Sequence, residues 1–98
     1  MRYSVISSKD FKKQFDKLDE KSHRIIYDKV QLIKENPYRF KAVHSKSYSK
    51  VFRVRLNLRG KETRLIYVVL QPNIILVCLL DRKKDYKDLE KYLKRIKK

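Results

Sequence analysis

The apolar residues near the start of the chain recur at helical spacing after one short strand. Residues 3–7 predict the strand, and Ser7 or Ser8 is the expected cap of the helix that follows, with Asp10 in its first turn, where the helix dipole favours an acid. Three apolar side chains then fall on one face of this helix: Phe11, Phe15 and Leu18. The pattern therefore predicts an amphipathic helix that packs on a sheet.

A second amphipathic helix is predicted next, and Ser22 is its expected cap. Its apolar residues recur every three or four positions: Ile26, Val30 and Ile33. Asn36-Pro37 ends the helix, because the residue before a proline avoids the helical conformation. The two helices form a helical hairpin, and residues 38–49, which have no clear period, are predicted to be a basic loop.

From residue 51 the apolar period changes to two, which is typical of a strand with one buried face. One side of the strand at residues 51–58 is apolar: Phe52, Val54, Leu56 and Leu58. The other side is polar: Arg53, Arg55 and Asn57. Gly60 suits a turn position with positive φ, and residues 63–70 are predicted to return as the second strand of a hairpin.

The length of this turn decides which arginines share a face. A two-residue loop, Arg59-Gly60, places Arg55 directly opposite Arg64, and a four-residue loop keeps the two arginines on one face, whereas a loop of three turns Arg64 to the other side. In the even-length cases five residues share one face: Arg53, Arg55, Arg64, Ile66 and Val68. The apolar part of that face must then be covered either by the final helix or by another chain.

The remaining elements complete an α+β fold. Gln71-Pro72-Asn73 predicts a turn, and residues 74–80 are apolar without alternation, as expected of a strand covered on both faces. The final helix has one apolar stripe: Tyr86, Leu89, Leu93 and Ile96. The order β-α-α-β-β-β-α predicts an N-terminal strand and helical hairpin packed on a small antiparallel sheet, with residues 1–98 forming one domain.

The charge of the chain adds an electropositive region to this fold. The 98 residues include 27 Lys and Arg against 11 Asp and Glu, a formal net charge of +16. Nine basic residues and one acid give residues 39–64 a charge of +8, and nine basic residues and three acids give residues 82–98 a charge of +6. A localised excess of this kind suits phosphates, so the expected partner is nucleic acid or an acidic protein.

Other classes of protein are excluded by what the sequence lacks. Its longest apolar stretch, residues 65–80, is interrupted by Gln71-Pro72-Asn73 and is too short to span a bilayer, so no membrane is expected. Cys78 is the only cysteine and the first residues lack the apolar run of a secretory signal, so we expect a cytoplasmic protein with Cys78 in its core. His23 and His44 are isolated, and no metal or cofactor is expected.

The arginines of the hairpin are the main candidates for chemistry. Grouped guanidinium groups repel one another, and between Lys50 and Arg64 the only acid is Glu62, so either solvent screens the group or an anionic ligand completes it. The planar fork of arginine suits phosphate oxygens. A second candidate group is residues 82–86, where Tyr86 either stacks on a base or opens the apolar stripe of the final helix.

On these segments the sequence resembles the RelE/ParE superfamily of toxins from type II toxin–antitoxin modules. Three motifs carry the resemblance: Phe52-Arg53-Val54-Arg55-Leu56, Arg64-Leu65-Ile66-Tyr67 and Arg82-Lys83-Lys84-Asp85-Tyr86. The likeness covers nearly the whole chain and includes its basic charge and the order of its elements. It implies a RelE/ParE-like fold and an endoribonuclease that enters the ribosomal A site and cuts mRNA without a metal, through attack of the ribose 2′-hydroxyl on the adjacent phosphate.

The resemblance also implies roles for single residues. Arg64 matches the arginine expected to stabilise the transition state, and Arg82 or Lys83 matches the late basic residue proposed as proton donor. Tyr86 matches the late aromatic that holds a base. Four residues of the basic segments are the candidate RNA contacts: Lys46, Tyr48, Lys50 and Lys84.

Two departures from the family pattern concern proton transfer. Arg53 and Arg55 fall where RelE has two lysines, and an arginine is a poor general base because it stays protonated. Many relatives carry a histidine where this chain has Asp81, which removes one acid/base candidate. Catalysis is then expected to depend mainly on orientation and charge stabilisation, or the activity is weak or different.

Two other functions stay open on the sequence. ParE-like members of the same superfamily share the Arg-Leu-Ile-Tyr segment and inhibit DNA gyrase without cutting RNA, and a basic nucleic-acid-binding module without catalysis would show the same charge. The partners implied by the resemblance are a small acidic RelB-like antitoxin with an amphipathic helix, the ribosome and mRNA, with DNA gyrase as the alternative.

Overall fold

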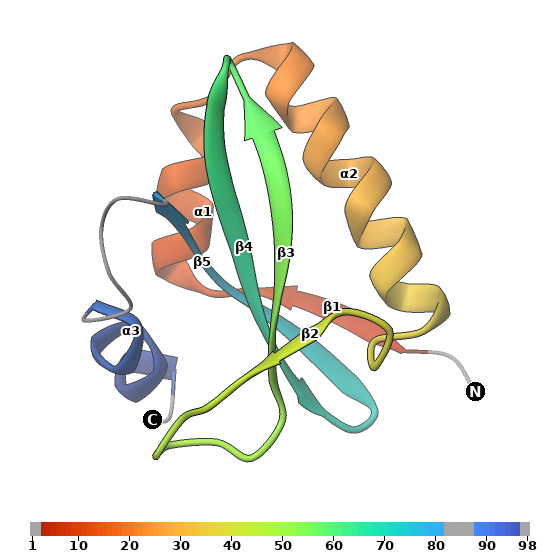
Figure 1. Cartoon of the computed structure of the whole chain (residues 1–98), viewed down its shortest axis with the longest axis vertical. Helices are drawn as coiled ribbons and strands as arrows, with labels where there is room; N and C mark the ends of the chain where they lie inside the picture. The colour runs from red at the N-terminus through yellow and green to blue at the C-terminus, as the bar shows by residue number, and fades with distance from the viewer. Residues whose placement is uncertain (1–2, 82–87, 97–98) are drawn as a thin grey trace.

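The computed structural model, which describes residues 3–81 and 88–96, is a five-stranded mixed sheet with helices on both faces (Figure 1). Its elements in chain order are β1 (Ser4–Ser7), α1 (Lys9–Asp16), α2 (Glu20–Glu35), β2 (Lys41–Val43), β3 (Val51–Leu58), β4 (Lys61–Leu70), β5 (Asn73–Asp81) and α3 (Leu89–Ile96). The strand order across the sheet is β1-β5-β4-β3-β2. The predicted α+β architecture is confirmed, with one strand more than predicted.

The sheet departs from the predicted one at both of its edges. The expected loop at residues 38–49 contains β2, which pairs antiparallel with β3 so that Lys41 lies opposite Arg53. A strand of three largely exposed residues is too short to show a period in the sequence. At the other edge β1 pairs with β5 in parallel, so the sheet is mixed rather than antiparallel. The helical hairpin is part of the long connection that a parallel pairing requires.

Side chains of α1 extend the hydrogen bonding of β5 beyond the end of β1. Ser8 caps the helix, because its Oγ accepts the Phe11 N–H at 3.0 Å, and the same hydroxyl donates to the Val77 carbonyl at 2.6 Å. The amide of Gln14 accepts the Leu79 N–H at 2.7 Å and donates to the Leu79 carbonyl at 2.9 Å. These bonds fix the helical hairpin against the sheet edge that β1 leaves uncovered.

The second helix begins about one turn earlier than predicted, because Asp19 and not Ser22 is its cap. The Asp19 carboxylate accepts the Ser22 N–H at 2.9 Å, and hydrogen bonds from the side chain and backbone of Ser22 lower the pKa of Asp19. Ser22 is itself buried in the first turn. Both residue types are good caps, so the pattern alone did not separate them. The predicted end is confirmed, with Glu35 the last helical residue and Asn36 the cap.

The β3–β4 hairpin has a two-residue loop. Leu58 pairs with Lys61, and the two loop residues Arg59 and Gly60 have φ angles of 55° and 79°. Two successive positive φ angles are what a type I′ turn requires, and glycine adopts this conformation without steric strain. The loop therefore sets the even register in which Arg55 lies directly opposite Arg64.

Two apolar clusters hold the layers together, one on each face of the sheet. The first lies under α1 and α2 and includes the apolar side of β3: Phe11, Ile26, Ile33, Phe52, Val54, Leu56, Leu58, Leu65 and Tyr67. The second lies under α3: Val51, Ile66, Val68, Val77, Cys78, Leu80, Leu89 and Leu93. The final helix is therefore what covers Ile66 and Val68, the first of the two predicted alternatives.

A bulge in β5 supplies one extra residue to the second cluster. Ile66 pairs with Cys78 while its neighbour Tyr67 pairs with Leu76, so Val77 has no partner of its own in β4. As a result Val77 and Cys78 are successive in sequence and both belong to the cluster under α3.

Candidate functional site

Arg53, Arg55 and Arg64 share one face of the β3–β4 hairpin, as the two-residue loop requires. Arg55 is exposed and stands directly opposite Arg64. Arg53 is half-buried, and the Arg64 side chain is only 14% exposed, with a guanidinium nitrogen 3.8 Å from the Glu62 carboxylate. We call these three residues the arginine face. Of the loop lengths that the sequence left open, the structure has the one that places Arg55 directly opposite Arg64.

This face brings like charges together. Two cationic pairs stand directly across neighbouring strands, Arg55 opposite Arg64 and Lys41 opposite Arg53. Like charges in this position destabilise a sheet by about 0.2–1 kcal/mol per pair. Glu62 is the single carboxylate that β2, β3 and β4 place on this face, and it offsets part of the repulsion. A bound phosphate would add further negative charge to this face.

The segment at residues 44–50, which carries three candidate RNA contacts, is fixed by α3. Glu90 accepts hydrogen bonds from the Ser47 hydroxyl at 2.8 Å and from the Lys46 N–H at 3.2 Å. Burial alone would raise the pKa of Glu90, but hydrogen bonds from Ser47, Ser45 and the Lys46 backbone outweigh burial and hold that pKa below its ordinary value. No local sequence pattern reveals this partner, because 43 positions separate Ser47 from Glu90.

The three candidate contacts of this segment differ in their exposure. Lys46 and Lys50 are exposed, and the Lys50 ammonium lies 5.2 Å from the centre of the Tyr38 ring. Tyr48 is half-buried against the second apolar cluster, and burial raises its pKa. Tyr38 in turn contacts Phe52, which belongs to the cluster under α1 and α2. Lys50 therefore lies on the opposite face of the sheet from Arg55, and the structure does not bring all the candidate contacts together.

Four predicted site residues lie outside the described residues: Arg82, Lys83, Lys84 and Tyr86. The strand that precedes them ends beside the arginine face. Asp81, the last residue of β5, pairs with Thr63, and Leu80 pairs with Arg64. β5 therefore ends one strand away from Arg64.

The Arg-Leu-Ile-Tyr segment is divided between the site and the core. Arg64 belongs to the arginine face, whereas Tyr67 is fully buried with its ring stacked on Phe52. The Tyr67 hydroxyl donates to the Pro37 carbonyl at 2.6 Å, and burial raises the pKa of this tyrosine. Tyr67 therefore ties the end of α2 to the sheet, and this part of the motif indicates the fold rather than the chemistry.

Other titratable groups have structural roles. Cys78 is buried, as predicted, and burial raises the pKa of its thiol, so the reactive thiolate is disfavoured. His44 is exposed, and the half-buried His23 stacks on Phe15 with ring centroids 4.0 Å apart.

Within residues 3–81 and 88–96 no three His, Cys, Asp or Glu residues are grouped to hold a metal. None of the helices described is long and apolar enough to cross a membrane.

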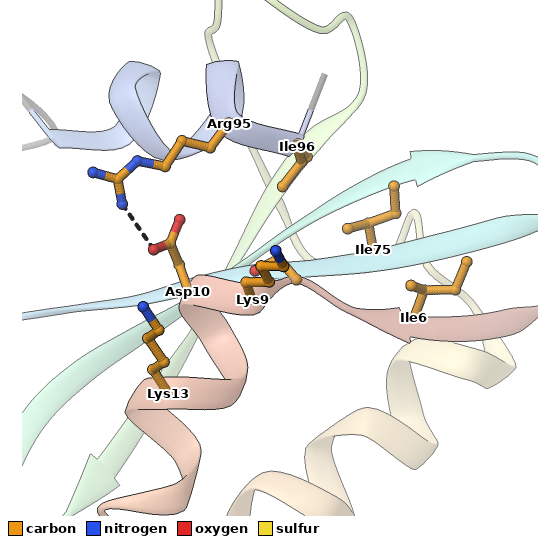
Figure 2. Close-up of a pocket in the computed structure, with 8 residues that line it drawn as sticks. Ile6, Lys9, Asp10, Lys13, Ile75, Arg95 and Ile96 are labelled. Carbon is orange, nitrogen blue, oxygen red and sulfur yellow. Dashed lines mark hydrogen bonds and ion pairs between the residues drawn. The ribbon is translucent and has the colours of Figure 1, made fainter. Parts of the chain in front are cut away.

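A hollow of about 620 Å³ lies at the opposite edge of the sheet, between α1, β1, β5 and α3 (Figure 2). Apolar side chains from three elements line it: Ile6, Ile75 and Ile96. Lys9 and Lys13 flank the hollow, and across it the Arg95 guanidinium of α3 lies 2.8 Å from the Asp10 carboxylate of α1. Together with Glu90, this ion pair fixes both ends of α3. The hollow is separate from the arginine face, which lies on β3 and β4.

Comparisons with known proteins find structural likeness without close sequence likeness. No protein-family model matches the chain, and no curated protein matches it significantly. A double arginine-to-alanine mutant of the E. coli toxin RelE in the free state matches with a TM-score of 0.74 at 20% identity, over 98% of this chain and 99% of that one.

Two toxin–antitoxin complexes contain chains that match in the same way. A chain of the intact E. coli RelBE complex has a TM-score of 0.68 at 18% identity, covering 84% of this chain and 99% of that one. A chain of the archaeal RelE–RelB complex from Pyrococcus horikoshii has a TM-score of 0.62 at 20% identity, covering 87% of this chain and 100% of that one. The chain therefore has the fold of the RelE toxins.

Proposed function

We propose that this chain is a RelE-like toxin that cuts messenger RNA on the ribosome. The observation that carries the proposal is the arginine face on a RelE fold. In the proposed reaction a ribose 2′-hydroxyl attacks the adjacent phosphorus and the bond to the 5′ oxygen breaks. One proton leaves the 2′-hydroxyl and one reaches the 5′ oxygen, so the products carry a 2′,3′-cyclic phosphate and a 5′-hydroxyl.

In the proposed reaction Arg64 stabilises the transition state. Its guanidinium group is mostly buried and is held near Glu62, so it is already oriented before a substrate arrives. Arg55, directly opposite, supplies a second cation for the charge that develops on the phosphorane oxygens. Because a guanidinium group stays protonated, these arginines act through charge and orientation and do not take up the proton.

The Arg-Leu-Ile-Tyr segment does not separate this proposal from gyrase inhibition. Tyr67 is buried and Leu65 and Ile66 are core residues, so any chain with this fold has reason to keep three of the four positions. The matching structures described above contain RelE proteins, and the arginine face is what favours a phosphate substrate over a protein target.

The test is to incubate the protein with programmed ribosomes and to map cuts in the message by primer extension. We expect cuts within the message at the A site and unimpaired supercoiling by DNA gyrase in a parallel reaction. Uncut message together with blocked supercoiling would replace this proposal with the ParE-like one. Uncut message and normal supercoiling would leave only a nucleic-acid-binding role.

We propose also that a small acidic antitoxin binds this chain in the cytoplasm. Two of the matching structures are toxin–antitoxin complexes, and the net charge of +16 favours an acidic partner. Ile66 and Val68 do not call for that partner, since α3 covers them. Co-expression with a short acidic reading frame next to the gene should yield a complex and relieve growth arrest. A monomer that is harmless when expressed alone would contradict the proposal.

A further inference from the structure

A second cationic site lies where α2 passes the edge of the sheet at β2 and β3. A hollow of about 350 Å³ opens there, and six residues line it: Lys29, Phe40, Lys41, Arg53, Val54 and Arg55. Four of the six are cationic and none is acidic. Its volume is at the small end of ligand-binding pockets, which suits one compact polar group rather than a folded partner.

Lys29 approaches this hollow from an unusual place on α2. Side chains three and four positions away are its neighbours on the helix surface, and here all four are apolar: Ile25, Ile26, Leu32 and Ile33. Lys29 therefore lies half-buried in the stripe that packs on the sheet, where α2 offers no carboxylate at helical-pair spacing. A lysine in such a stripe keeps its charged end at the nearest polar opening, which is the hollow.

The sheet adds further donors at the same edge. β2 begins at Lys41, opposite Arg53, so among the described residues β3 has no neighbouring strand on that side from Val54 onward. The Val69 N–H of β4 donates to the Lys50 carbonyl at 3.0 Å, so Lys50 points its backbone groups toward β4. Successive residues of a strand point their N–H and C=O groups to alternate sides, so those of Arg53 and Arg55 point away from β4. The Arg55 N–H therefore faces the edge that β2 leaves uncovered.

We propose that this hollow holds a backbone phosphate of single-stranded RNA. Lysine ammonium groups and arginine forks both bind phosphate oxygens, and an anion here relieves the repulsion between Lys41 and Arg53. Arg53 and Arg55 belong both to the hollow and to the arginine face, so the site continues that face around the edge of β3. The identity of the ligand rests on the proposed function, and the site would position the strand on which Arg64 acts.

The inference is tested by RNA binding without ribosomes. A short fluorescent 2′-O-methyl RNA, which lacks the attacking hydroxyl, is titrated with protein at several salt concentrations and followed by anisotropy. The variants are Lys29→Gln, Lys41→Gln and the double variant. Lys21→Gln is the matched control, because Lys21 is an exposed residue of α2 that does not line the hollow and loses the same charge.

We expect each hollow variant to bind about threefold to tenfold more weakly than the wild type, and the control to stay within about twofold. In the double variant the plot of log affinity against log salt should also be less steep by about 0.7, the value expected when the protein neutralises one phosphate fewer on a single strand. Affinity losses no larger than that of Lys21→Gln, or a salt dependence that is unchanged in the double variant, would overturn the inference. Poly-glutamate that binds as tightly as the RNA, with the same dependence on Lys29 and Lys41, would overturn it in favour of an acidic protein.

Thermal unfolding of each variant separates a binding defect from a folding defect, and Lys41→Gln alters only an exposed side chain. Because the assay measures binding and not cleavage, its outcome is independent of the proposed activity. A chain that shows the expected lysine dependence but leaves ribosome-bound message uncut would retain the phosphate site and lose the proposed function.

Discussion

Replacing Arg55 by glutamine should stabilise the protein while it weakens the proposed function. Arg55 is exposed and directly opposite Arg64, so its charge adds repulsion that a neutral side chain removes. Such a pair is worth about 0.2–1 kcal/mol, and salt screens it over a Debye length of about 10 Å at 0.1 M. We expect Arg55→Gln to raise the free energy of unfolding by about 0.5 kcal/mol at low salt, which corresponds to a thermal midpoint higher by about 2–4 °C.

The assay is urea denaturation at about 50 mM and about 0.5 M salt, where screening differs strongly. Lys61→Gln is the matched control, because Lys61 is an exposed residue of the same hairpin that loses the same charge but lies opposite Leu58. The gain from Arg55→Gln should shrink at high salt, and ribosome-dependent cleavage should fall. Equal stabilisation by Lys61→Gln would show that net charge and not the Arg55–Arg64 pair is responsible. Destabilisation by Arg55→Gln would refute the repulsion.

Three further predictions concern single side chains. Arg64→Ala should slow single-turnover cleavage by about 10²–10³-fold with a much smaller loss of ribosome affinity. Arg64→Lys should recover only part of the rate, because lysine lacks the planar fork of the guanidinium group. An affinity loss as large as the rate loss would contradict a role of Arg64 in the transition state. Tyr67→Phe leaves the Pro37 carbonyl without its 2.6 Å bond and should lower the free energy of unfolding by about 1–2 kcal/mol in urea with cleavage unchanged. Glu90 has a lowered pKa, so its contribution to stability is present above its unfolded pKa, near 4.5, and is lost as the pH falls through the lowered value. In Glu90→Gln the thermal midpoint should lose this part of its fall at acid pH. If the midpoint depends on pH as it does in the wild type, Glu90 does not have this role.

The parts of the fold that could be predicted are those with a long local pattern. The alternation along residues 51–58 identified β3 and its buried side, and the single Gly60 indicated the loop that sets the register. β2 could not be predicted, because three residues carry no period and the strand exists only through its pairing with β3. The parallel pairing of β1 with β5 was missed for a related reason, since it joins Ser4 to Asn73 across most of the chain.

The candidate site divides in the same way. Arg53 and Arg55 could be placed on one side of their strand from the alternation alone, but Arg64 joins them only because the turn has two residues, a length that the sequence left open. Glu90 could not be connected to residues 44–50, since their contact arises only when α3 packs on the sheet. Lys29 did leave a signal, a lysine among the apolar positions of a helix, but its position beside β3 depends on how α2 crosses the sheet.

If the arginine face on this RelE fold cleaves the RNA backbone as proposed, the ends of the RNA fragments show it most directly. Programmed ribosomes are treated with the wild type and with Arg64→Ala in parallel, and the 3′ ends of the message fragments are analysed chemically. We expect 2′,3′-cyclic phosphate ends with the wild type and a rate lower by about 10²–10³-fold with Arg64→Ala. Intact message with the wild type, or equal cutting by both proteins, would contradict it.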